Sequence, residues 1–189
     1  MTKYLRMMAM ISIFAIPAGC QMDHSTSASD VKAANAEMNR EANAALQSLY
    51  TKTPQARALA QRAKGILVFP DVLKAGLIAG AHHGEGELIE NGKVTGYYAT
   101  TAASYGLQAG VQRFGYVMFF MTSSALNDLK TSNGFEVGVG PSIVVVDSGM
   151  AKSITTSTTQ SDIYAFIFDQ KGLMAGLGLQ GSKITKLSR

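Results

Sequence analysis

The stretch from residue 76 to residue 121 constrains the fold most, because apolar residues alternate along its middle with small or polar ones. The apolar positions are Tyr105, Leu107, Ala109 and Val111, and the positions between them are Ser104, Gly106, Gln108, Gly110 and Gln112. A period of two predicts a β-strand with two unlike faces. Glycine in a strand is entropically costly, so we expect another backbone, a ring or a ligand to lie close to the glycine-rich face.

An unbroken apolar run covers residues 116–121 directly after this alternation. It is too short to span a membrane and long enough for a strand that is covered on both faces. Asn91-Gly92 predicts a two-residue hairpin turn before it, and short strand-like segments continue to residue 187. The pattern predicts an α+β fold that is predominantly antiparallel β, with a curled or barrel-like sheet.

Two helices are expected before the sheet. Residues 28–50 place their apolar side chains at helical spacing, with Ser29 or Asp30 as the N-cap. Thr53 and Pro54 then predict the N-cap and first residue of a second helix, which we expect to stop at Gly65. Both helices are predicted to pack on the sheet.

The first 19 residues have the pattern of a signal peptide. Lys3 and Arg6 precede an apolar segment at residues 7–16, and Pro17-Ala18-Gly19 leads to Cys20, the single cysteine of the chain. Small residues before one cysteine resemble the lipobox of bacterial lipoproteins, in which the cysteine is acylated with fatty acids such as palmitate. The alternative interpretation is an ordinary cleaved signal followed by an incidental cysteine.

Three segments follow from this interpretation: a signal peptide at 1–19, an acylated Cys20 with a flexible tether at 20–30, and a domain at 31–189. Gln21 follows Cys20, where an Asp would resemble an inner-membrane retention signal. We therefore expect a lipid anchor in the bacterial outer membrane, with the body in the periplasm or at the cell surface.

Basic residues are concentrated between positions 51 and 76, where Asp71 is the only acid. These residues are Lys52, Arg57, Arg62, Lys64 and Lys74. They are candidates for binding anionic lipid head groups, and the alternative is a solvated helix face. Without the signal peptide the chain has 15 basic and 13 acidic residues, and no basic-aromatic motif occurs, so nucleic acid is not an expected partner.

Residues that could support catalysis are few. His83 and Glu85 share one face of a predicted strand with Glu87 and are weak candidates for metal ligands. A solvated hairpin face is the alternative, and no metal or other cofactor is predicted. The sequence has neither a G-x-S-x-G elbow nor an HExxH helix, so we expect no enzyme activity.

An ordered set of short motifs resembles the SYLF-domain family from about residue 40 to residue 187. The motifs are Ala63-Lys64-Gly65, Val68-Phe69-Pro70, Lys74-Ala75-Gly76, Gly106-Leu107-Gln108-Ala109-Gly110, Gly140-Pro141, Asp162-Ile163-Tyr164 and Gly172-Leu173-Met174-Ala175-Gly176. No single motif is specific, and the resemblance depends on their order.

The resemblance implies a lipid-binding module. In this chain it implies recognition of an anionic phospholipid, with the five basic residues at the head group and Tyr97, Tyr98 and Tyr105 in contact with the lipid. The second hypothesis is a structural envelope lipoprotein that acts through protein contacts or self-association, using exposed sheet edges.

Overall fold

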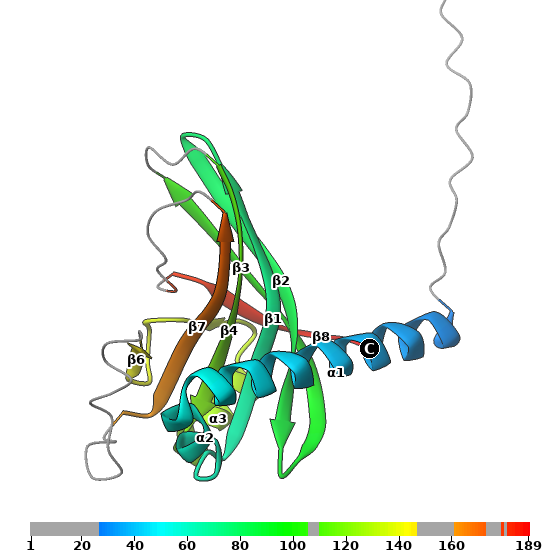
Figure 1. The fold of residues 1–189 in the computed structure, drawn as a ribbon, viewed down its shortest axis with the longest axis vertical. Coiled ribbons are helices and arrows are strands. Elements are labelled where there is room, and N and C mark those ends of the chain that lie inside the picture. The colour runs from blue at the N-terminus through cyan, green and yellow to red at the C-terminus, as the bar shows by residue number, and fades with distance from the viewer. Residues whose placement is uncertain (1–26, 106–109, 147–160, 173–178, 180) are drawn as a thin grey trace, which may run out of the picture.

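The computed structural model describes residues 27–105, 110–146, 161–172, 179 and 181–189, and Figure 1 shows their arrangement. Three helices lie in this part of the chain: α1 (Ala28–Lys52), α2 (Pro54–Ala60) and α3 (Ser123–Thr131). None of the described helices is long and apolar enough to cross a membrane. The predicted signal peptide, Cys20 and most of the tether lie outside the described residues.

The N-terminal helices begin where local chemistry favours them. Ser27 caps α1 through a capping box, in which its side chain accepts from the Asp30 N–H and the Asp30 carboxylate accepts from the Ser27 N–H. The helix therefore begins at Ala28, inside the predicted tether, and the prediction of Ser29 or Asp30 as the N-cap is wrong because Ser27 provides the cap. Pro54 occupies the first residues of α2 as expected, although Thr53 makes no side-chain capping bond.

Eight strands form one sheet in the order β5-β8-β3-β2-β1-β4-β7-β6. Their bounds are β1 (Gly65–Gly76), β2 (Ala79–Glu90), β3 (Lys93–Tyr105), β4 (Gly110–Phe120), β5 (Phe135–Glu136), β6 (Ile143–Val146), β7 (Ile163–Gly172) and β8 (Lys183–Leu187). Every pairing is antiparallel except β6 with β7. The curled, mostly antiparallel sheet with α1 and α2 packed on it confirms the predicted fold class.

The first strand is longer than its sequence indicates. In the sequence, Pro70 ends the apolar run of residues 66–69, but β1 continues through it to Gly76. The registers of β1 with both neighbours shift between Val68 and Val72, which marks a β-bulge at the proline. A bulge tolerates proline because the missing N–H is not needed for the ladder there. The extra length carries β1 and β2 up to the top of the molecule (Figure 1).

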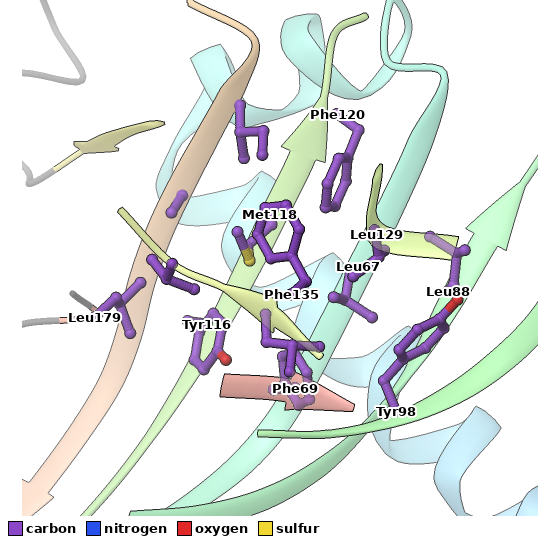
Figure 2. Packing of buried hydrophobic residues seen from close by; sticks show 14 of the residues in the cluster. Leu67, Phe69, Leu88, Tyr98, Tyr116, Met118, Phe120, Leu129, Phe135 and Leu179 are labelled. Atoms are coloured by element: carbon purple, nitrogen blue, oxygen red, sulfur yellow. The ribbon is translucent and has the colours of Figure 1, made fainter. Parts of the chain in front are cut away.

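The inner face of the sheet, defined by Phe69, Tyr98 and Tyr116, carries the larger core. Figure 2 shows these side chains with Leu67, Met118 and Phe120 packed from neighbouring strands, closed over by Leu129 of α3 and by Phe135. The rings of Phe69 and Tyr116 lie 4.7 Å apart. This core fixes the curl of the sheet, because α3 and β5 fold back over the same face.

The outer face of the sheet, defined by Val68, Val117 and Phe119, is covered by the N-terminal helices. Residues Ala42, Ala45, Leu46 and Leu49 of α1 and Ala56 and Leu59 of α2 are buried against it. The small side chains let α1 lie close to the strands. Only the second half of α1 is buried in this way, and its first half extends beyond the sheet (Figure 1).

Candidate functional site: a polar row beneath an apolar hairpin tip

Three buried polar side chains form a row across the upper part of the inner face. Lys74 of β1 is the direct register partner of His82 on β2 and of Gln112 on β4. The three side chains are exposed by 7% or less. Phe114 of β4 borders the row, with its ring edge-on to His82 at 6.2 Å. The β ladder therefore brings together residues that are up to 38 positions apart.

Several polar atoms of the inner face have no hydrogen-bond partner among the described residues. They are His82 Nε2, Gln112 Oε1 and Ser182 Oγ. Buried polar groups are normally satisfied, and exceptions are common at sites that receive water or a ligand. Burial, together with the positive charges of Lys74 and His83, lowers the pKa of His82 below its ordinary value. The row thus combines one cation, a neutral imidazole and an amide.

An apolar tip lies immediately beyond this row. Leu77 and Ile78 form the turn between β1 and β2, and they are 75% and 61% exposed. Leu73 and Val111 extend the exposed apolar surface onto the outer face of β1 and β4. We call these four residues the hairpin tip. Such a cluster of exposed apolar side chains at the end of a sheet is typical of a surface that contacts a membrane or a partner.

Basic residues accompany the hairpin tip on the outer face. Leu73 pairs with Arg113 of β4, and Arg113 pairs with Lys171 of β7, so the three side chains lie in one row. Arg113 also forms an ion pair with Asp71. The tip therefore has cationic groups beside it on both faces, with Lys74 on the inner one.

The structure separates the five basic residues singled out from the sequence. Lys64 precedes β1 and Lys74 lies near its other end, and a strand of this length spans about 35–40 Å. Lys52 and Arg57 lie with Lys64 at the lower end, near α2 (Figure 1). Lys52 is ion-paired with Asp169, and Arg57 lies over the Tyr50 ring at 5.7 Å. Lys74 therefore does not share a surface with Lys52, Arg57, Arg62 and Lys64.

Tyr97 and Tyr98, two of the three tyrosines predicted to contact lipid, lie on opposite faces of the sheet. Tyr98 belongs to the inner core with 1% exposure, which argues against lipid contact at the surface. Tyr97 lies on the outer face beneath Arg189, whose guanidinium is 5.2 Å from the ring centre. The side chain of Tyr105 lies outside the described residues, as does Cys20.

The two weak metal candidates, His83 and Glu85, lie on the outer face of β2. Glu85 forms an ion pair with Arg189, and Arg189 also donates to Asn35 Oδ1 at 3.3 Å. His83 lies exposed on the same outer face. Among the described residues, no group of three His, Cys, Asp or Glu side chains is placed to hold a metal ion. Arg189 instead fastens the C-terminus to β2, β3 and α1.

Close contacts explain part of the glycine pattern. A Cβ on Gly86 would overlap the Val68 carbonyl oxygen and lie 2.7 Å from the Phe69 ring, and one on Gly115 would lie 2.5 Å from the Phe168 ring. Aromatic rings of the two cores therefore occupy the space that these glycines leave. Of the two glycines in the alternating stretch, Gly106 lies outside the described residues and Gly110 begins β4.

Sequence reasoning missed the hairpin tip and the partners of Lys74. The pair Leu77-Ile78 contains neither glycine nor asparagine and therefore carries no turn signal of its own. The signal available was two exposed aliphatic residues between Lys74-Ala75-Gly76 and Ala79-Gly80. The position of Gln112 beside Lys74 could not be inferred, because it depends on pairing β1 with β4.

The described residues form a curled, mostly antiparallel β-sheet whose inner face holds a buried polar row next to an exposed apolar hairpin tip. Residues 101–188 match the family Ysc84, described as Las17-binding protein actin regulator. The match lies within the part of the chain whose motifs resemble the SYLF-domain family, and it confirms that resemblance. No curated protein matches the chain.

Proposed function

We propose that this protein is a lipoprotein of the bacterial outer membrane, anchored through Cys20, whose SYLF domain binds anionic phospholipid without catalysing a reaction. The hairpin tip is the observation that carries the proposal. Leu77 and Ile78 project from the free end of two long strands, and burial of each such side chain contributes about 1.5–3 kcal/mol at most.

Charge supports an anionic partner. Lys171 and Arg113 lie on the outer face beside the tip, and Lys74 lies on the inner face three residues before Leu77. A cation near an anionic bilayer contributes roughly 1 kcal/mol. The inner row of Lys74, His82 and Gln112 offers a cation and polar groups that suit a phosphate oxygen.

The size of these contributions suits a domain that is already tethered. A few kilocalories per mole give weak binding in free solution. An acylated Cys20 would hold the domain at high local concentration beside the bilayer, so that weak contacts suffice. The tip and the anchor are thus complementary signals for one membrane surface.

The test uses residues 21–189, which lack the acylated cysteine, and flotation with vesicles of phosphatidylglycerol and phosphatidylcholine or of phosphatidylcholine alone. We expect flotation with the anionic vesicles, weakened by added salt. The double variant Leu77→Ser, Ile78→Ser should lose most of it. Val139→Ser is the matched control, because Val139 has the same 61% exposure as Ile78 and lies outside the hairpin.

A second comparison locates the membrane face. Lys52→Ser with Lys64→Ser alters the lower end of the molecule, and it should leave flotation nearly unchanged. Loss of flotation in this variant alone would move the lipid site to the α1–α2 surface. Equal binding to neutral vesicles, or none, contradicts the proposal, and a defined oligomer without lipid affinity would favour the structural lipoprotein that acts through protein contacts.

A further inference from the structure

A second site lies far from the hairpin tip, between the N-terminal helices and the outer face of the sheet. There a cleft of about 440 Å³ is enclosed by α1, the end of α2 and the β2–β3 hairpin. Its volume falls within the range of small-ligand sites. The apolar part of its lining includes Leu46, Ile66 and Ile89.

Glu87 of β2 is the unusual residue of this cleft. Its side chain has no exposed surface, and neither carboxyl oxygen has a hydrogen-bond partner among the described residues. It projects from the outer face, where its register partners are Val68 and Tyr97. Leaving a buried carboxyl group unpaired is costly, so the fold retains here two strong acceptors without donors.

The remaining polar lining consists largely of neutral amides. The amide side chains belong to Asn39, Asn43, Gln47, Gln61 and Asn91. Asn39, Asn43 and Gln47 recur every four residues along α1 and therefore share one side of the helix. Asn43 Nδ2 donates to Asn39 O at 2.7 Å and to Asn39 Oδ1 at 2.9 Å, which fixes these two side chains.

The charges around the cleft restrict the ligand. Lys64 lines it and disfavours a cationic ligand, and Glu87 disfavours an anionic ligand when its carboxyl group is ionised. Amides offer both donors and acceptors, and the carboxyl oxygens need donors. Hydroxyl groups meet both requirements, and the ring of Tyr50, which also lines the cleft, offers an apolar surface.

We propose that this cleft binds a neutral polyhydroxyl group, a sugar or a polyol, with its hydroxyls donating to Glu87 and exchanging hydrogen bonds with Gln47 and the other amides. Because Glu87 is covered, side chains of the lining must shift before a hydroxyl group can reach it. The site is independent of the hairpin tip and of lipid binding.

Saturation-transfer NMR on the full chain tests this, in a detergent whose head group contains no sugar. The probes are glucose, N-acetylglucosamine and glycerol, with ethylammonium and acetate as charged comparisons. We expect transfer to at least one polyhydroxyl probe and to neither ion. Transfer to glycerol alone would identify a glycerol-type head group, and transfer to a sugar would identify a saccharide, and both support the proposal.

Variants then assign the binding to the cleft. Glu87→Gln and Gln47→Leu should each weaken binding by about tenfold or more, and Glu136→Gln, an exposed carboxylate on β5, should leave it unchanged. Gln47 is exposed, so its replacement tests the site even if Glu87→Gln perturbs folding. The proposal would be overturned if no polyhydroxyl probe showed transfer or if ethylammonium alone did. It would also be overturned if Glu87→Gln and Gln47→Leu both bound the probe as well as the wild-type protein does.

Discussion

Lys74 and His82 face each other as direct partners across β1 and β2, both buried on the inner face of the sheet. Burial disfavours a positive charge on the His82 imidazole and lowers its pKa, and the ammonium group of Lys74 adds to this effect. The pair therefore holds a single positive charge beneath the hairpin tip. The effect of His82 on stability can be measured without knowing the ligand. The same holds for Glu87, a separate buried group on the outer face.

His82 should make the protein sensitive to acid. Because its pKa is lowered in the folded state, the unfolded chain binds more protons below about pH 6.5, and the free energy of unfolding falls as the pH drops from there. His82→Leu should flatten the fall in melting temperature between pH 7 and pH 5. His83→Leu, an exposed neighbour, is the control. An unchanged acid profile in His82→Leu would contradict this.

Glu87 should act in the opposite direction. Burial raises its pKa from 4.5 to about 7, with Tyr97, Tyr50 and Lys64 as the titratable groups around it. The folded state then binds more protons between these values, so stability is lost as the pH rises through 7, by an amount on the order of 3 kcal/mol. Glu87→Gln should remove this loss and raise the melting temperature at pH 8. Glu136→Gln should not, and a wild-type profile in Glu87→Gln would refute the assignment.

Gly86 is required for packing. A methyl group there meets the Val68 carbonyl and the Phe69 ring, so Gly86→Ala should destabilise the protein by about 2–3 kcal/mol in urea unfolding. Gly96→Ala is the matched comparison, because its Cβ would meet Tyr98 at 3.1 Å, near the limit of ordinary contact. We expect a cost below about 1 kcal/mol there. Equal effects would show that strand propensity, not the close approach, governs Gly86.

Cys20 should determine where the protein is found. If it carries the acyl anchor, Cys20→Ser should abolish labelling by radioactive palmitate and release the protein from the outer-membrane fraction. Ser25→Ala, in the tether that follows, should change neither property. Retention of Cys20→Ser in the membrane would mean that another part of the chain provides the attachment.

The local elements of this fold could be predicted because their signals are local. A stripe of apolar residues at helical spacing identifies α1, and Pro54 starts α2. Asn91-Gly92 forms the turn between β2 and β3, with positive φ at both residues. Alternation and β-branched runs likewise identified most strands and the antiparallel, curled character of the sheet. Thr122 caps α3, and its side-chain oxygen accepts from the Ala125 N–H, another local signal of a helix start.

The sequence by itself therefore determined the elements and the type of sheet, while only the tertiary structure decided which side chains meet. Lys74 was predicted to share a lipid-binding surface with Lys64 because both are basic and near in sequence. The twelve-residue strand β1 instead holds them at opposite ends of the molecule. The bulge at Pro70 sets the face on which Lys74 lies, and strand pairing brings it to His82 and Gln112. Periodicity places Glu87 on a face, but its burial depends on the packing of α1 over that face, a long-range contact with no local signal.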